Sequence, residues 1–270
     1  MDARDCAAVR FGDRAMTGTS SLDLACPICA GKAVAHDVVD FSKSCVEGSG
    51  TFLPLCGVPI YYFLCGQCGL CFAPEMYRWT PDEFGRKIYN EEYTLVDPDW
   101  IEARPRGNAQ HLAELFGAEG AGIRHLDYGG GIGLLSDLLQ GAGWNSRSYD
   151  PFVDRDVRLE DLGKFDLITS FEVFEHVPDS LRLIDELASL LDENGLIYFS
   201  TLVTEGNIAP HQRLTWWYAA PRNGHITLYT RNSLAILGAR QGFRFGSITT
   251  NLHLYWRQVP AWAQQLFARG

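Results

Sequence analysis

The sequence predicts an α/β protein built on a doubly wound, mostly parallel sheet, with a small cysteine-rich module before it. A glycine-rich turn joins an apolar segment to the start of a helix at residues 127–139, and strand-like and helix-like segments alternate after it. Strands that alternate with helices form a parallel sheet that is covered on both faces. Two C-x2-C turns near the N-terminus, at 26–29 and 65–68, predict the separate module.

The first segments along the chain predict a tail and a zinc-binding module. Residues 1–20 mix charges of both signs with glycine, serine and threonine, and we interpret them as a mobile tail. A zinc-ribbon-like module is expected at residues 21–75, with strands at 34–41 and 60–64 between its cysteine turns. Each turn presents two thiolates, and two turns complete a tetrahedral structural zinc site. The expected ligands are Cys26, Cys29, Cys65 and Cys68.

Other residues leave alternatives to this zinc site open. Cys71 extends the second turn to C-x2-C-x2-C, a spacing that also suits an iron–sulfur cluster. His36, Cys45 or Cys56 would be able to replace one ligand. The chain has eight cysteines and no apolar secretory segment, which indicates a reducing, cytoplasmic setting. No run of eighteen apolar residues is present, so we expect no membrane span.

A helical linker is expected at residues 76–105. Thr80, Pro81 and Glu83 form the pattern of a capping box at the start of a helix. Tyr89 and Tyr93 follow this helix start. They either pack the module against the next domain or line the cofactor site.

The glycine-rich turn predicts the cofactor. Asp127 ends an apolar run, and Gly129, Gly131 and Gly133 follow it in the spacing D-x-G-x-G-x-G. Glycine permits the tight turn and lets the backbone approach a ligand closely. The carboxylate beside the turn suits a ligand with an ammonium and a sulfonium and would repel a pyrophosphate, which favours S-adenosylmethionine over a dinucleotide. Asp150 ends the next apolar segment, about twenty residues later, where a carboxylate can bind both ribose hydroxyls.

The elements after Asp150 continue the alternation. We expect a strand at 165–170, a helix at 179–191, a turn at 194–195 and a second strand at 196–201. Only fourteen residues separate Asp150 from the strand at 165–170, which is too few for another helix and strand. One edge of the sheet is therefore predicted to be abbreviated.

These motifs together resemble the class I S-adenosylmethionine-dependent methyltransferases. The matching pieces, within about residues 106–250, are LDYGGGIG, Asp150 at the end of a strand, FDLITSFEVFEHVPD, GLIYFST and HITLYTRNSLAILGARQGF. The resemblance implies a Rossmann-like methyltransferase domain over residues 106–270, with a substrate-side insert at residues 202–230. It also implies a carboxylate near the adenine, for which Asp161 is the candidate, and we expect Phe171 to contact the cofactor. The alternative is a Rossmann-like domain that binds NAD or another nucleoside cofactor, or none.

Candidate catalytic residues follow the strand at 165–170. Glu172, Glu175 and His176 should lie at the carboxyl edge of the sheet, where the acceptor meets the cofactor. An imidazole with a reference pKa near ~6.5 suits a general base, so His176 is the first candidate, and His211 and His225 are alternatives.

The E-x-x-E-H pattern at Glu172, Glu175 and His176 has a second interpretation. It resembles the metal site of 3-demethylubiquinone and small-RNA 2′-O-methyltransferases, in which two carboxylates and a histidine hold a divalent ion. That resemblance implies a divalent ion at these three residues, although the second histidine of the RNA enzymes has no adjacent counterpart here. A purely structural loop is the remaining alternative.

Charge and aromatic residues bear on the acceptor. The net charge is −10, but residues 206–270 contain seven arginines and no acid, so that segment carries +7 and the rest −17. An arginine-rich roof over the cleft suits an anionic acceptor, while the alternative is that these arginines face the acidic body or water. Duplex nucleic acid is not expected to bind so acidic a body. Trp216 and Trp217 either stack on the acceptor or pack the insert onto the sheet. Residues 260–267 predict a short amphipathic helix that docks on the body.

The function predicted from the sequence is S-adenosylmethionine-dependent O-methylation of a small or carrier-linked anionic metabolite. Similarity to enzymes of bacterial sugar and secondary metabolism leaves C-methylation of a nucleotide sugar as an alternative. A non-catalytic methyltransferase fold that docks a protein or RNA partner through the zinc ribbon is a third possibility. The oligomeric state is left open.

Overall fold

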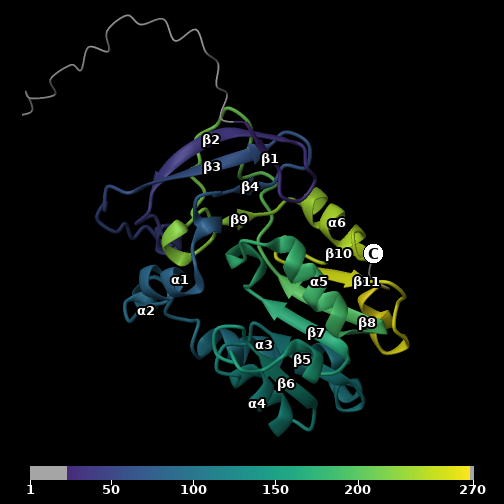
Figure 1. Ribbon diagram of the computed structural model, residues 1–270. Coiled ribbons are helices and arrows are strands. Elements are labelled where there is room, and N and C mark those ends of the chain that lie inside the picture. Colours follow the sequence, from purple (N-terminus) through teal and green to yellow (C-terminus); the bar gives the residue numbers. More distant parts are fainter. Residues whose placement is uncertain (1–22, 268–270) are drawn as a thin grey trace, which may run out of the picture.

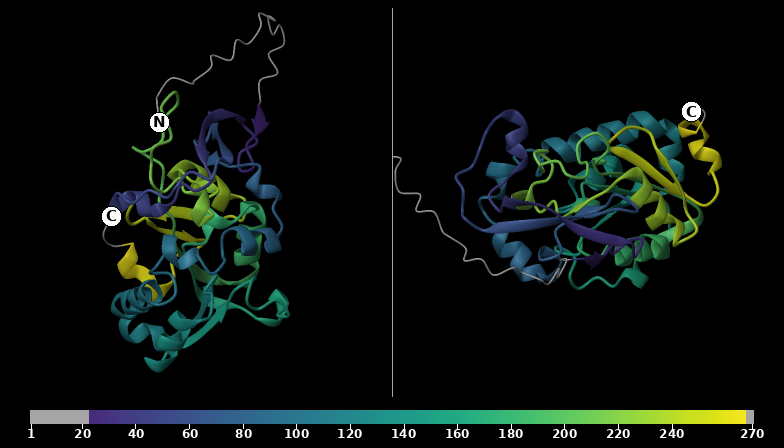
Figure 2. Two further views of the ribbon diagram at one scale, coloured as in Figure 1. Left: turned by 90° about the vertical axis from the view of Figure 1, so that its left-hand side faces the viewer. Right: turned by 90° about the horizontal axis from the view of Figure 1, so that it is seen from above.

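The computed structural model describes residues 23–267, and these form two sheets. In Figure 1 the smaller sheet lies above the larger one, and the left view of Figure 2 shows the same arrangement from another side. The tail predicted at residues 1–20 lies outside the described residues.

The larger sheet has six strands in the order β10-β11-β8-β7-β5-β6. Four neighbours, β8, β7, β5 and β6, run parallel, whereas β11 pairs antiparallel with both β8 and β10. This is the predicted doubly wound, mostly parallel sheet. Its strands are β5 (Arg124–Tyr128), β6 (Asn145–Tyr149), β7 (Phe165–Phe171), β8 (Leu191–Ser200), β10 (Arg244–Ser247) and β11 (Leu252–Trp256).

Helices cover both faces of this sheet because its inner strands are apolar on both sides. Leu167 of β7 packs in one cluster with residues of α3 and α4, while Ile168 packs in another with residues of α5 and α6. The helices are α3 (Ala103–Phe116), α4 (Leu134–Gly141), α5 (Ser180–Leu190) and α6 (Arg231–Ala239).

The edge at β6 is abbreviated as predicted. Between Asp150 and Phe165 the described chain forms turns and the short 3-10 helix η4 (Leu159–Asp161), and no strand pairs with the outer side of β6. The parallel sheet therefore ends at β6, directly beside the glycine-rich turn.

The smaller sheet is antiparallel and contains one strand from far along the chain. Strands β1 to β4 come from the N-terminal module, but β9 comes from the insert predicted at residues 202–230 and pairs with β4. The module and the methyltransferase region therefore share a sheet, and neither predicted boundary separates them. The strands are β1 (Leu24–Ala25), β2 (Lys32–Asp40), β3 (Pro59–Cys65), β4 (Cys71–Phe72) and β9 (Thr227–Leu228).

The linker is helical, and its predicted capping box is confirmed. Thr80 Oγ1 accepts a hydrogen bond from Glu83 N at 3.2 Å, and the Glu83 carboxylate accepts one from Thr80 N at 2.9 Å. The boundary expected after residue 105 falls inside α3. The linker holds η2 (Met76–Arg78), α1 (Pro81–Lys87), α2 (Tyr93–Val96) and the start of α3.

Two elements differ from the expected bounds. Strand β8 begins at Leu191 instead of 196, because Phe165 pairs with Leu191 while Leu167 pairs with Leu196, so the turn expected at 194–195 is a bulge inside the strand. The C-terminal segment forms the 3-10 helix η7 (Ala261–Leu266) and docks on the body as predicted, with the Trp262 ring 5.5 Å from that of Phe116. The other 3-10 helices are η1 (Cys45–Ser49), η3 (Gly117–Gly122), η5 (Phe174–His176) and η6 (Pro221–Asn223).

Within residues 23–267, every helix is too short or too polar to cross a bilayer.

The aromatic stack beneath β8 should carry much of the stability of the fold. Phe199 is fully buried, and its ring lies 4.3 Å from that of Phe174 and 4.8 Å from that of Tyr255. We expect Phe199→Ala to lower the free energy of unfolding in urea by about 3–5 kcal/mol, because the cavity would not refill. Phe52→Ala is the control, since Phe52 is 72% exposed and should cost less than about 0.5 kcal/mol. Equal effects of the two variants would contradict this account of the core.

Candidate functional site

The glycine-rich turn leaves one side of the backbone open for a ligand. Gly129 has φ +79° and donates from its N–H to Tyr149 O at 2.7 Å, which holds the turn against β6. A Cβ at Gly130 would lie 2.4 Å from Asp127 Oδ2, whereas a Cβ at Gly131, φ +56°, would meet nothing within 4 Å. Gly133, φ +87°, precedes α4. The loop is therefore packed on its inner side and free on the other, as a cofactor cradle requires.

Two carboxylates flank this cradle. Asp127 is buried, its Oδ1 accepts a hydrogen bond from Thr169 Oγ1 at 2.9 Å, and burial together with the charge of Asp150 raises its pKa to about 7. Asp150 accepts hydrogen bonds from Gly131 N at 3.0 Å and from Phe152 N at 2.8 Å. Both acids therefore adjoin the turn, and their binding of a cofactor stays a prediction. A cationic ligand group would stabilise the ionised form of Asp127.

The other two predicted cofactor residues lie in different places. Asp161 sits on the exposed turn η4, and its carboxylate is paired with Arg158 at 3.0 Å. Phe171, at the end of β7, lines a cavity at that end of the strand, and its ring packs edge-on against Tyr198 at 5.7 Å. Contact of either residue with a cofactor stays a prediction.

A cavity of about 330 Å³ lies at the carboxyl end of β7, where the acceptor is expected. Four separate parts of the chain enclose it: the N-terminal module, the linker, the sheet edge and the insert. Its lining is Cys45, Asp97, Arg104, Asn108, Phe171, Glu172, His176, Ser200, Leu202, Trp217, Tyr218, Asn223, His225, Asn251 and Leu252.

The structure brings together three of the predicted catalytic residues in a tight group. One ligand atom from each of Glu175, His176 and His225 lies within 4.8 Å of the others. The insert supplies His225, and Ile226 N donates to Glu175 O at 2.9 Å, which fixes the two segments side by side. The second histidine that seemed to be missing from the E-x-x-E-H motif is thus present in space, 49 positions further along the chain.

Glu172 adjoins this group and lines the cavity. Its backbone has φ +54°, a left-handed conformation that is unusual for a residue with a side chain and is found at functional sites. Its Oε1 accepts from Ser200 Oγ at 2.7 Å, and Ser200 Oγ in turn accepts from Glu172 N at 2.9 Å. These two contacts fix the carboxylate toward the cavity.

The electrostatics of the group favour a cation. Burial and the charge of Glu172 raise the pKa of Glu175 to about 8, and burial, with Arg104 nearby, lowers the pKa of His176 to about 4. Burial also lowers the pKa of His225 far below its ordinary value. Both imidazoles are therefore neutral, which is the state that binds metals, and the carboxyl would ionise readily beside a cation.

Hydrogen bonding in the group agrees with this charge state. His225 Nδ1 lies 2.8 Å from Tyr218 O, so this nitrogen carries the proton and Nε2 keeps its lone pair. Glu175 Oε1 accepts from Tyr218 Oη at 2.5 Å. Glu175 Oε2 and His176 Nδ1 are buried without a hydrogen-bond partner among the described residues. The residues therefore fit a divalent ion.

The low pKa of His176 changes the role expected for it. A base with a pKa of about 4 holds a proton weakly at neutral pH, so the general-base role has less driving force than the reference value implies. His211 lies outside the cavity lining.

Of the aromatic and arginine residues expected near the acceptor, only some line the cavity. Trp217 lines the cavity, whereas Trp216 is buried in the packing of the insert. The described arginines after residue 206 do not line the cavity: Arg213 pairs with Asp37 at 2.9 Å, and Arg222 donates to Ile88 O at 3.1 Å.

The positively charged side chain that lines the cavity, Arg104, comes from the linker. Arg104 makes a two-pronged ion pair with Asp97, at 2.7 and 3.1 Å. Neither residue is marked by a local motif, so sequence reasoning missed both, together with Asn108 one turn further along α3 and Cys45 in the N-terminal module.

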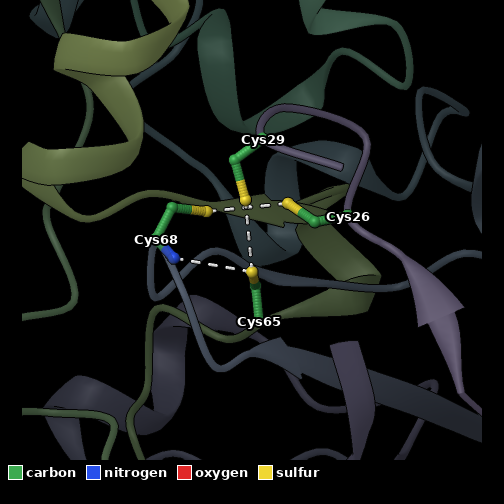
Figure 3. A group of neighbouring side chains, drawn as sticks. All are labelled: Cys26, Cys29, Cys65 and Cys68. Atoms are coloured by element: carbon green, nitrogen blue, oxygen red, sulfur yellow. Dashed lines mark hydrogen bonds between the residues drawn. The ribbon is translucent and has the colours of Figure 1, made fainter. Parts of the chain in front are cut away.

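The four cysteines of the two C-x2-C turns converge (Figure 3). Sulfur–sulfur distances are 3.6 Å for Cys26 and Cys68 and 3.5 Å for Cys29 and Cys65. Zinc–sulfur bonds of about 2.3 Å in a tetrahedron require edges of roughly 3.8 Å, so the group could hold a zinc ion. Cys71 packs in a different apolar cluster with the linker and the insert, away from these sulfurs.

A family model identifies the family of this chain, and curated relatives agree with it. Residues 100–247, more than half of the chain, match a family model described as a methyltransferase domain. The ubiquinone biosynthesis O-methyltransferase of Actinobacillus pleuropneumoniae serotype 7 (strain AP76) is 32% identical over 154 residues, covering 46% of this chain and 58% of that protein. That of Colwellia psychrerythraea (strain 34H / ATCC BAA-681) is 34% identical over 94 residues, covering 34% and 37%. The chain thus spans between about a third and three fifths of these relatives.

Among solved structures, one similar chain is the Burkholderia thailandensis 1,6-didemethyltoxoflavin-N1-methyltransferase with bound 1,6-didemethyltoxoflavin and S-adenosylhomocysteine. It is 16% identical, and the match covers 72% of this chain and 96% of that chain with a TM-score of 0.47.

We propose that the four-cysteine group holds a structural zinc ion. Elemental analysis of the purified chain should find about one zinc per chain, and Cys26→Ser should lose most of it, because three thiolates bind zinc less tightly than four. Cys56→Ser is the matched control, since Cys56 is exposed and lies outside the group. Iron in place of zinc, or unchanged zinc in the Cys26 variant, would contradict the proposal.

Proposed function

We propose that this chain, which belongs to the methyltransferase-domain family, transfers a methyl group from S-adenosylmethionine to a hydroxyl oxygen of a small molecule. The observation that carries the choice of oxygen is the group of Glu175, His176 and His225 beside the cavity. A divalent ion bound there would lower the pKa of a hydroxyl that coordinates it. Oxygen acceptors need this activation, because a neutral hydroxyl is a poor nucleophile.

The cradle supports the choice of cofactor. The free side of Gly131 faces open space, and Asp127 and Asp150 stand on either side of the turn. A buried carboxyl with a raised pKa is a suitable partner for an ammonium group. A pyrophosphate at the same place would be repelled by the negative charges of Asp127 and Asp150. The matched relatives are named as O-methyltransferases, which agrees with oxygen as the acceptor atom.

The protein's own residues would align the acceptor and exclude water. Phe171 and Trp217 give the cavity apolar walls, and Tyr89 lies between the cradle and the cavity, 5.8 Å from Phe152 and 6.3 Å from His176 between ring centroids. In the displacement, the acceptor oxygen forms a bond to the methyl carbon as the carbon–sulfur bond breaks. We propose that Glu172, fixed by Ser200, accepts the hydroxyl proton.

The acceptor that fits this cavity is small and hydroxylated. The sequence predicts an anionic acceptor from the C-terminal arginines, but none of the described ones lines the cavity. Arg104 is the cation that an acceptor anion would meet, and it would have to share its guanidinium with Asp97. We therefore propose a hydroxylated metabolite of modest size, with at most one anionic group directed at Arg104.

Cofactor binding should depend on Asp150. We expect the wild-type chain to bind S-adenosylmethionine in calorimetry and Asp150→Ala to weaken binding by about tenfold or more, because hydrogen bonds to a charged group contribute about 1.5–3 kcal/mol. Asp156→Ala is the control, since Asp156 is exposed on the same segment. Binding of NAD in place of S-adenosylmethionine, or equal affinities of the two variants, would overturn the cofactor assignment.

Cation binding should depend on Glu175. Its pKa of about 8 means that it is mostly protonated at neutral pH without a cation, so the neutral amide of Glu175→Gln preserves the fold. We expect the wild-type chain to bind Mn²⁺ in electron paramagnetic resonance titrations and Glu175→Gln to bind it at least about tenfold more weakly, because a carboxylate is a far better ligand than an amide.

Glu193→Gln is the matched control for this titration, because Glu193 is exposed and does not line the cavity. S-adenosylmethionine affinity should be retained in Glu175→Gln. Identical Mn²⁺ affinity in the wild type and in Glu175→Gln would exclude this cation site.

A further inference from the structure

A buried chain of hydrogen bonds runs beneath the cofactor cradle. His125 lies on β5, between β6 and β7, two positions before Asp127, and is completely buried. Its Nδ1 lies 2.8 Å from Ser146 Oγ on β6, and its Nε2 lies 2.9 Å from Thr169 Oγ1 on β7. Neither the glycine motif nor the proposed cation site involves this histidine.

One end of this chain of hydrogen bonds is Asp127, a predicted cofactor ligand. Thr169 Oγ1 donates to Asp127 Oδ1 at 2.9 Å, and at the other end Ser146 Oγ donates to Ser136 Oγ at 3.0 Å. All five side chains are less than 9% exposed, so bulk water cannot replace any of these contacts. The orientation of one hydroxyl therefore constrains the next one along the chain.

The neutral imidazole of His125 has two tautomers, and each sets one direction of donation along this chain of hydrogen bonds. Burial lowers the pKa of His125 to about 3, so the ring carries a single N–H at neutral pH. If Nε2 carries it, His125 donates to Thr169, Thr169 donates to an ionised Asp127, and the Ser146 hydroxyl turns from Ser136 to donate to Nδ1. If Nδ1 carries it, His125 donates to Ser146, Thr169 donates to Nε2, and Thr169 can accept only from a protonated Asp127.

The ionised form of Asp127 has little other support among the described residues. The charged group that acts on it is Asp150, after β6, which disfavours ionisation. β7 contributes the Thr169 hydroxyl, and the glycine turn packs against the carboxyl without a side chain. Among the contacts described for Asp127, the hydrogen bond from Thr169 therefore favours its ionised form, and His125 controls the direction of that hydroxyl.

We propose that His125 is a positioning residue for the cofactor, and that its Nε2–H tautomer directs this chain toward Asp127 and holds the carboxylate ready for a cationic ligand group. The inference rests on the proposed function for the ligand, but the tautomer itself is a property of the protein alone. Two experiments separate these parts.

The first experiment needs no cofactor. Nitrogen-15 chemical shifts of the His125 ring, followed from pH 6 to pH 9 in the wild-type chain, should change from the Nδ1–H to the Nε2–H tautomer as Asp127 ionises. In Asp127→Asn the amide can donate to Thr169, so the Nδ1–H tautomer should persist at all pH values. A tautomer that is the same in both proteins throughout the range would overturn the proposal, whatever the chain binds.

The second experiment measures binding of S-adenosylhomocysteine by calorimetry at pH 7 and pH 9. His125→Leu should bind about fivefold more weakly than the wild type at pH 7 and within about twofold of it at pH 9. Without the Nε2–H that directs it, the Thr169 hydroxyl donates less well to Asp127, and we expect the pKa of Asp127 to rise by about one unit. Thr169→Val should behave in the same way, and Thr169→Ser, which keeps the hydroxyl, should restore the wild-type profile.

The control is His253→Leu, which removes another buried histidine with a hydroxyl partner, Ser247, on β11 and β10. It should lower stability without a pH-dependent change in affinity. If His125→Leu weakens binding by the same factor at both pH values, His125 is only a packing residue. If the wild type does not bind S-adenosylhomocysteine at all, the proposed function fails, and the tautomer measurement still decides the inference.

Discussion

The hydrogen bond from Ile226 N to Glu175 O is the contact on which the site depends. It joins the insert to the turn after β7, so that His225 stands beside His176 with ring centroids 4.8 Å apart. The next two residues form β9, which pairs with β4 and extends the N-terminal sheet. Residues 225–228 therefore bring His225 beside Glu175 and His176, help to enclose the cavity, and attach the N-terminal module.

The same edge of the sheet concentrates buried acids without cationic partners beside them. The pKa values of Asp127 and Glu175 are both raised, chiefly by burial, to about 7 and about 8. Burial of a carboxyl is unfavourable unless a partner stabilises it. In the function we propose, the partners would be ligands: an ammonium group at the cradle and a divalent ion at the cavity. Without ligands, a large fraction of each buried carboxyl is protonated at neutral pH, and a bound cationic group would stabilise the ionised form.

Local patterns sufficed for much of this structure, and contacts across long separations account for the rest. The glycine turn, the alternation of strands and helices, the abbreviated edge and the capping box at Thr80 follow from residues close together in the sequence. The pairing of His225 with His176 does not, since β9 is too short to show a period and no motif marks it. The roof expected from the C-terminal arginines failed for a similar reason: Arg213 and Arg222 find acceptors in the module and the linker.

The position of the cysteine group gives the N-terminal module a part in the cavity. Thr230 Oγ1 donates to Cys68 O at 2.5 Å, and Arg240 donates to Ile28 O at 3.2 Å, so both cysteine turns are tied to α6 and its start. At the other end of the module, Cys45 N donates to Asn223 Oδ1 at 2.8 Å, and Cys45 itself lines the cavity. A ribbon that served only to dock a partner would have no need to reach the acceptor. Metal binding at the cysteines would hold β2, β3 and β4 in register and so fix one wall of the cavity, which makes the module part of the enzyme we propose.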